Sequence, residues 1–310
     1  MIANLPDGNS PLSAYEIFAE VDFIVTDLDG TLIAGDFPVL KQIKDSILRL
    51  KKKQTQITVA TGRTYYGAKT RIQELGINFG MPVAVYNGGI VVEYGTGNVL
   101  YESYISCKVI QDLLRFVNLE KNNIYVYTFA LSIPFFSEGR DECVKEVVYA
   151  WGKPKKKKDV NGMDIHYMQE KSFFKKNITA ILIESNMTQR EKEILVVVLQ
   201  QYPHIRITDS GNGFIEIKGK GKDKGIINDI LREEKFSAKK ILAIGDNNND
   251  VELFKGADIS VAVGNTSDLG REYADYVCER DSAEGFSDML KVLEDAKRYY
   301  GEKNEGYGRV

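Results

Sequence analysis

The chain contains few of the residues that usually build nitrogen or sulfur sites for metals and nucleophiles. Its 310 residues include two histidines, His166 and His204, and three cysteines, Cys107, Cys143 and Cys278. Two histidines exclude a histidine-rich metal site, and a Ser–His triad would have to use one of them. Cysteines that are far apart and odd in number argue against a disulfide framework or a zinc site, so we expect a cytoplasmic protein in a reducing environment.

The chain also lacks a dominant charge and long apolar runs. Its formal net charge at pH 7 is -3, so we expect no nucleic acid and no membrane as a main partner. No run approaches the roughly 18 apolar residues that span a bilayer. The N-terminus has no basic segment followed by an apolar stretch, so we expect no signal peptide. The length predicts one large or two medium-sized domains.

Apolar, β-branched runs alternate with helical periodicities near both ends of the chain. The first block has expected strands at 21–27, 56–60 and 81–85, separated by helices that begin at Pro38 and Thr64. The same rhythm returns from 239 to 300. This alternation predicts an α/β fold, with a Rossmann-like parallel-sheet core of three α/β/α layers.

The middle of the chain has a different pattern. Two extended runs about a glycine-rich turn predict a hairpin within 88–105, and further strands are expected at 123–130, 178–185, 205–211 and 213–219. Helices are expected at 108–119, 141–150 and 188–202. We therefore predict an inserted α+β cap domain at 91–217, between the two parts of the catalytic core at 1–90 and 218–310.

Acidic side chains follow two of the predicted core strands. Asp27 ends the first strand and is followed by Asp29, whereas Asp246 and Asp250 follow the strand that begins at Ile241. Because ligands bind beyond the carboxyl ends of parallel strands, we expect these residues to converge there, together with Thr61. An all-oxygen cluster without nearby histidine or cysteine favours Mg²⁺ over zinc or copper.

Four motifs occur in a characteristic order: DLDGT at 27–31, ATGR at 60–63, DKG at 223–225 and GDNNND at 245–250. With them the chain resembles the haloacid dehalogenase (HAD) superfamily of phosphohydrolases, specifically its Cof-like members with a type IIB cap. The segments YNGG at 86–89 and VAVGN at 261–265 also match flanking features of that family. The resemblance covers nearly the whole chain.

The resemblance implies how the acids work. Asp27 would be the nucleophile that forms an aspartyl-phosphate, and Asp29 the general acid and base. Magnesium would be held by the Asp27 carboxylate, the backbone carbonyl of Asp29 and Asp246. Asp250 would be a further ligand or would orient a metal-bound water.

The transferring phosphoryl group needs hydrogen-bond donors and a positive charge around it. Candidates that would bind phosphate or substrate are Thr61, Gly62, Arg63, Asn87, Lys224 and Asn249. Four of them have an alternative: Lys222 could take the place of Lys224, Arg63 could cap a loop, Asn249 could cap a helix, and Asn87 could simply form a turn. The lysine run at 155–158 could be a solvated loop or could attract an anion.

We therefore expect a Mg²⁺-dependent phosphomonoester hydrolase that acts on a small phosphorylated metabolite, in particular a sugar phosphate. The alternatives are a phosphosugar mutase on the same scaffold and a non-catalytic binding protein. We expect a monomer or a homodimer.

Overall fold

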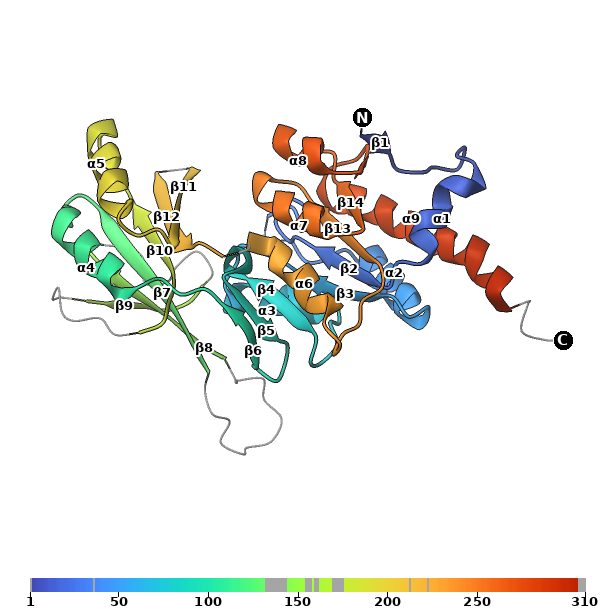
Figure 1. Ribbon diagram of the computed structural model, residues 1–310, viewed down its shortest axis with the longest axis horizontal. Helices are drawn as coiled ribbons and strands as arrows, with labels where there is room; N and C mark the ends of the chain where they lie inside the picture. Colours follow the sequence, from blue (N-terminus) through green and yellow to red (C-terminus); the bar gives the residue numbers. More distant parts are fainter. Residues whose placement is uncertain are drawn as a thin grey trace. The chain divides into compact units, whose positions relative to one another are not determined.

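Six parallel strands form the sheet that carries the predicted core motifs (Figure 1). They lie in the order β1 (Ala3–Asn4), β15 (Tyr276–Val277), β14 (Ile259–Ala262), β13 (Ile241–Gly245), β2 (Phe23–Thr26) and β3 (Gln56–Val59). Every neighbouring pair is parallel. All residues of β2, β13 and β14 are buried, as expected for a sheet covered on both faces.

This computed structural model describes residues 2–35, 37–131, 144–153, 158, 162–168, 176–211, 213–221 and 223–305. Cys143, Lys222 and three of the four lysines at 155–158 lie outside the described residues. No helix in the part of the chain that is described has the length and apolarity required to cross a membrane.

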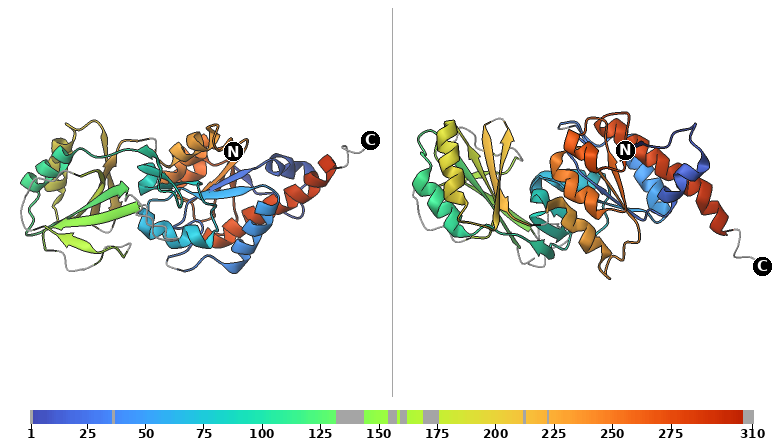
Figure 2. Two further views of the ribbon diagram at one scale, coloured as in Figure 1. Left: turned by 90° about the horizontal axis from the view of Figure 1, so that it is seen from below. Right: turned by 45° about the horizontal axis from the view of Figure 1, so that its top comes forward.

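Two groups of helices cover the parallel sheet. The first group packs α9 (Ser282–Glu305) against α2 (Lys41–Lys52), α1 (Glu16–Ala19) and the short 3-10 helix η1 (Leu12–Tyr15). The second packs α7 (Val251–Gly256) against α6 (Ile226–Arg232) and α8 (Asp268–Tyr273). Figure 2 shows the two groups on opposite faces of the sheet. The predicted three-layer, Rossmann-like core is therefore confirmed.

One further strand lies beside β3. Strand β4 (Pro82–Val85) adjoins β3 through a parallel bridge between Ala60 and Ala84, and the Thr61 amide donates to the Ala84 carbonyl at 2.9 Å. Helix α3 (Tyr65–Glu74) connects β3 to β4, and Gly76, with φ +60°, follows its end. The predicted β-α-β-α-β order of the first block is thus present.

The chain divides into two compact units. The first comprises Met1–Gly62, Ala68–Gly88 and Lys222–Val310, and the second comprises Arg63–Gly67 and Gly89–Gly221. The predicted limits of the core and the cap, 1–90, 91–217 and 218–310, stay a prediction.

The second unit has a six-stranded, mostly antiparallel sheet. Its order is β11 (Ile205–Gly211), β12 (Phe214–Gly219), β10 (Ile178–Glu184), β7 (Asn123–Leu131), β8 (Val144–Trp151) and β9 (Ile165–Tyr167), with β8 and β9 parallel. Helices α4 (Cys107–Phe116) and α5 (Gln189–Leu199) share one buried apolar cluster with these strands. Strands β5 (Ile90–Glu93) and β6 (Val99–Glu102) form the predicted hairpin. This α+β unit is the cap expected from the sequence.

The helix predicted at 141–150 is wrong over 144–150, and 141–143 lie outside the described residues. Residues Val144–Trp151 form strand β8, which pairs with β7 over eight residues and with β9 on its other side. The β-branched pair Val147 and Val148 suits this pleated environment, and the two neighbouring strands supply hydrogen bonds that a local pattern does not reveal. Trp151 ends the strand and is 1% exposed.

Candidate active site

Asp27 and Asp246 stand at the carboxyl ends of two adjacent strands. In the register of β2 and β13, Thr26 pairs with Ile244, and the Asp27 amide donates to the Ile244 carbonyl at 3.0 Å. Strand β3 lies on one side of β2, whereas β13 lies on the other side of β2 and is followed across the sheet by β14 and β15. This reversal of strand order is where open α/β sheets form their ligand-binding crevice.

Three carboxylates gather at this crevice. One oxygen from each of Asp27, Asp246 and Asp250 lies within 4.8 Å of the others. Asp27 and Asp250 are buried, and Asp246 is half-buried. Three acids that close repel one another, and an all-oxygen donor set fits a hard divalent cation such as Mg²⁺. The structure thus brings together three of the four predicted metal-binding residues.

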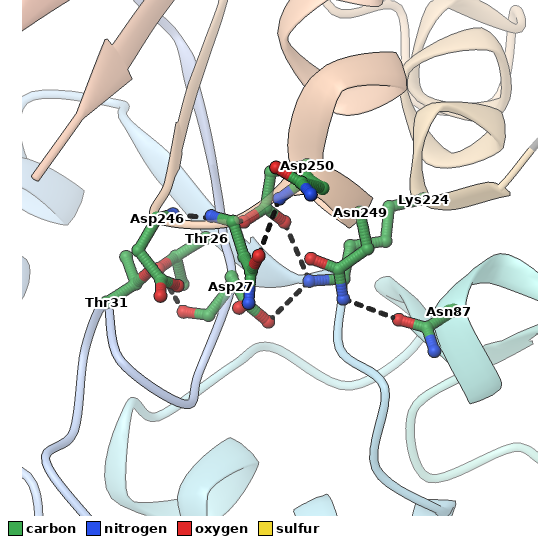
Figure 3. A network of polar contacts seen from close by, with 10 residues as sticks. Thr26, Asp27, Thr31, Asn87, Lys224, Asp246, Asn249 and Asp250 are labelled. Atoms are coloured by element: carbon green, nitrogen blue, oxygen red, sulfur yellow. Dashed lines mark hydrogen bonds and ion pairs between the residues drawn. The ribbon is translucent and has the colours of Figure 1, made fainter. Parts of the chain in front are cut away.

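Lys224 supplies the positive charge inside this cluster. Its Nζ lies 2.8 Å from Asp27 Oδ1 and 2.7 Å from Asp250 Oδ1 (Figure 3), and the side chain is 1% exposed. Burial by itself would lower the pKa of Lys224, but the charges of Asp250 and Asp27 outweigh burial and raise it. Lys224 therefore stays protonated and fixes the orientation of both carboxylates.

Two of the acids, Asp27 and Asp246, are less easily ionised than free aspartates, because their pKa values are raised. Burial raises the pKa of Asp27, the nearby Lys224 opposes this shift, and the charge of Asp250 adds to it. Burial likewise raises the pKa of Asp246, against the hydrogen bond from Thr31 and with the charge of Asp250. One lysine therefore does not neutralise three acids, and a bound cation would relieve the remaining repulsion.

The loop after β2 reaches directly to Asp246. Thr31 Oγ1 donates to Asp246 Oδ1 at 2.8 Å, and both residues are labelled in Figure 3. Gly30 has φ +81°, and a Cβ there would lie 2.4 Å from Asp246 Oδ2. The Asn265 side chain donates to the Gly30 carbonyl at 3.0 Å and holds this turn from β14's side.

Asp250 is held on both of its oxygens. Oδ1 faces Lys224, whereas Oδ2 accepts from the amides of Asp246 at 3.0 Å and Asn247 at 2.9 Å. A Cβ on Gly245 would lie 2.6 Å from the Asp250 Cγ, so this carboxylate needs a glycine beside it. Gly245 and Asn247 both belong to the GDNNND motif, but their roles were not predicted from it.

Thr61, Asn87 and Asn249 form a second polar group next to the acids. The Asn87 amide donates to the Thr61 carbonyl at 2.9 Å, and Asn249 Nδ2 donates to Asn87 Oδ1 at 2.9 Å. Thr61 is fully buried, whereas Gly62 and Asn249 are exposed. Three loops that follow β3, β4 and β13 thus meet at one place.

Two further predicted site residues have other backbone or side-chain contacts. Asp29 is exposed and its backbone pairs with Ile33. Arg63 belongs to the second unit, where its guanidinium donates to the Gly67 carbonyl at 3.2 Å. The roles predicted for both residues remain predictions.

Comparison with known proteins adds three kinds of similarity. A family model for haloacid dehalogenase-like hydrolases matches residues 24–290. MG265 of Mycoplasma genitalium is 26% identical over 275 residues, covering 85% of this chain and 94% of that protein. The phosphoglycolate phosphatase of Methanobrevibacter smithii is 22% identical over 272 residues, covering 87% and 97%. The structure of the HAD subclass IIB sugar phosphatase BT4131 is similar with a TM-score of 0.63 at 20% identity, covering 87% and 98%.

Proposed function

Because this chain belongs to the haloacid dehalogenase-like hydrolases, we propose that it is a Mg²⁺-dependent hydrolase of phosphomonoesters. The observation that carries the proposal is the cluster of Asp27, Asp246 and Asp250 at the crevice between β2 and β13, in which the buried Asp27 and Asp250 are ion-paired with Lys224. One oxygen of the Asp27 carboxylate is ion-paired with Lys224, and Asp27 directly follows the last residue of β2. A carboxylate held in this way can accept a phosphoryl group.

The reaction has two steps. An Asp27 oxygen attacks phosphorus while the bond to the ester oxygen breaks, and Asp29 donates a proton to the leaving alcohol. Asp29 then removes a proton from a water that attacks the aspartyl-phosphate, which releases inorganic phosphate and restores Asp27. When bound at Asp27, Asp246 and the Asp29 carbonyl, Mg²⁺ would offset the charge of the carboxylates and the phosphate. The exposed position of Asp29 supports its role, because it can exchange protons with solvent.

The phosphate oxygens would be held by donors from three loops. Thr61, the amide of Gly62 and Asn249 would supply hydrogen bonds, and Lys224 a fixed positive charge. Full burial of Lys224 between two carboxylates favours it over a solvated lysine for this role. Arg63 stays a candidate for a contact with the substrate.

We propose a small phosphorylated metabolite, in particular a sugar phosphate, as the substrate class. Two of the similar proteins support this choice, because one is named a sugar phosphatase and the other a phosphoglycolate phosphatase. Both names refer to enzymes that act on small phosphorylated metabolites.

The test is a phosphate-release assay over a panel of sugar phosphates, phosphoglycolate and p-nitrophenyl phosphate, with Mg²⁺ or with EDTA. We expect release only with Mg²⁺, and Asp27→Asn should fall below about a tenth of the parent rate because the nucleophile is lost. Asp22→Asn is the matched control: it lies at the opposite end of β2, where its carboxylate accepts from the amides of Lys239 and Lys240, each at 2.9 Å.

Activity of Asp22→Asn should stay close to that of the parent. Turnover by Asp27→Asn above about a tenth of the parent rate would exclude Asp27 as the nucleophile. A mutase would instead convert a sugar monophosphate with a bisphosphate activator and release no free phosphate. A non-catalytic binding protein would release no phosphate from any ester in the panel.

A further inference from the structure

The segment after β4 has an unusual backbone. Tyr86, Asn87 and Gly88 follow one another with φ values of +53°, +55° and +80°. Glycine adopts such a conformation readily and asparagine tolerates it, but a buried tyrosine does so only when its surroundings enforce it. Strained residues of this kind concentrate where a protein needs a precise local geometry.

Gly88 brings this segment against the backbone that carries Lys224. A Cβ on Gly88 would lie 1.9 Å from the Asp223 carbonyl oxygen and 2.9 Å from the Lys224 amide nitrogen. Asp223 itself has φ +51°, so the two facing segments are both left-handed at the contact. The main chain around Lys224 therefore cannot move independently of residues 86–88.

Asn87 connects the same segment to two other loops. Its backbone amide donates to the Thr61 carbonyl, and its side-chain Oδ1 accepts from Asn249 Nδ2 (Figure 3). A Cβ on Gly62 would lie 3.1 Å from the Asn87 Oδ1. Asn87 is only 9% exposed, and its side-chain oxygen is already engaged by Asn249. These contacts favour an indirect role over direct contact with the phosphate.

We propose that Asn87 is a positioning residue that holds Asn249 and the Thr61–Gly62 loop in register with Lys224. The inference rests on the proposed function, since it concerns the groups that would bind the phosphoryl oxygens. Donors aimed at the charge of a transition state must be fixed before the reaction, and small displacements of such groups are costly. Loss of the Asn87 side chain should therefore lower kcat more than it raises KM.

Asn87→Gly separates this role from that of a simple turn former. Glycine prefers the left-handed backbone, so a turn-forming role alone predicts parent activity and an unchanged or higher Tm. The positioning role predicts the same Tm behaviour but a kcat lower by about tenfold or more, with KM within about threefold. In an Asn249→Ala background, Asn87→Gly should cause little further loss, because the shared hydrogen bond is already gone.

Gln54→Gly is the matched control. Gln54 is exposed, has φ +64° and follows α2, so the substitution relieves a left-handed residue away from the site. Its kcat and KM should equal those of the parent. Parent kcat in Asn87→Gly would overturn the proposal, and so would equal losses by Asn87→Gly in the parent and Asn249→Ala backgrounds.

Vanadate with Mg²⁺ provides a readout that needs no turnover. Vanadate can adopt the five-coordinate geometry of phosphoryl transfer, so its affinity should fall in Asn87→Gly by about the factor lost in kcat, whereas that of inorganic phosphate should fall less. Thermal-shift titrations measure the affinities for vanadate and for inorganic phosphate. A parent that binds vanadate but hydrolyses no ester would refute the proposed function and leave the positioning role standing if Asn87→Gly weakens vanadate binding. Equal vanadate affinity in the two proteins, or no vanadate binding by the parent, would refute the positioning role.

Discussion

Gly30 links backbone conformation to the charge of the acidic site. Its φ of +81° is costly for residues with a side chain, and a Cβ there would lie 2.4 Å from Asp246 Oδ2. Gly35, in the same loop, has φ +69°, but a Cβ there would meet no atom within 4 Å. The two glycines thus share the backbone requirement, and only Gly30 lies against the Asp246 carboxylate.

Alanine at these two positions should therefore have unequal effects. Gly35→Ala should lower the free energy of unfolding by about 1 kcal/mol, from backbone strain alone. Gly30→Ala should cost about 1–3 kcal/mol more, because Asp246 must move, and should weaken the stabilisation by Mg²⁺. Urea unfolding with and without Mg²⁺ measures both quantities. Equal losses and equal Mg²⁺ responses in the two variants would show that contact with Asp246 is unimportant.

The sequence identified several residues of the site, but it did not reveal their hydrogen-bond partners. The acids and Lys224 were identified because motif and strand context place them at one edge of the sheet. Their partners were harder to foresee: Thr31 donates to Asp246, which lies 215 residues further along the chain. Such a contact depends on the exact register of β2 and β13, and no local pattern encodes that register.

Among the elements, those of the parallel sheet were the most predictable. Buried β-branched runs followed by amphipathic helices identify them, and β2, β3, β4 and β13 lie where they were expected. Strand β8 was mistaken for a helix because its stability comes from two neighbouring strands. Strand β1 has two residues and exists only through its pairing with β15, so the sequence contained no periodicity to detect.

Helices α6 and α7 are joined by a buried amide. Asn228, which is 0% exposed, donates from Nδ2 to the Leu253 carbonyl at 2.9 Å, and a Cβ on Gly256 would lie 2.7 Å from that nitrogen. Helix α6 follows Lys224 directly, and α7 follows Asp250. This junction therefore supports the ion pair between Lys224 and Asp250.

Asn228→Ala should lower the free energy of unfolding by about 1–3 kcal/mol, because it leaves the Leu253 carbonyl without this donor and opens a cavity. Asp229→Ala is the control on the same helix: Asp229 is exposed, and its loss should stay within about 0.5 kcal/mol. Urea denaturation at one pH compares them. A loss for Asn228→Ala no larger than that for Asp229→Ala would contradict the structural role of this amide.

For the molecule as a whole, the first unit is assembled from both ends of the chain, with most of the second unit inserted between them. Asp27 comes from the first part, and Lys224, Asp246 and Asp250 come from the last. Folding of this unit therefore concentrates three acids and one lysine in a buried place that the unfolded chain keeps dispersed. The free-energy cost of that concentration is a property of the whole fold, and a cation would reduce it.

This cost gives the stability a characteristic pH dependence. Burial raises the pKa of Asp27 to about 8 and that of Asp246 to about 6, whereas aspartates in unfolded chains titrate near about 3.9. Because the pKa is raised by folding, the metal-free folded state binds more protons than the unfolded state between these limits. The stabilisation by protonation is complete at low pH and is lost as pH rises through about 6 and then about 8.

Mg²⁺ should replace the protons on Asp27 and Asp246, so its effect on Tm should be small at pH 5.5 and clearly larger at pH 8.5. Thermal unfolding with Mg²⁺ or EDTA at each pH measures this difference, and Asp27→Asn should flatten it because one of the two titrating carboxylates is removed. A Mg²⁺ effect of the same size at both pH values would show that these buried acids do not form the cation site.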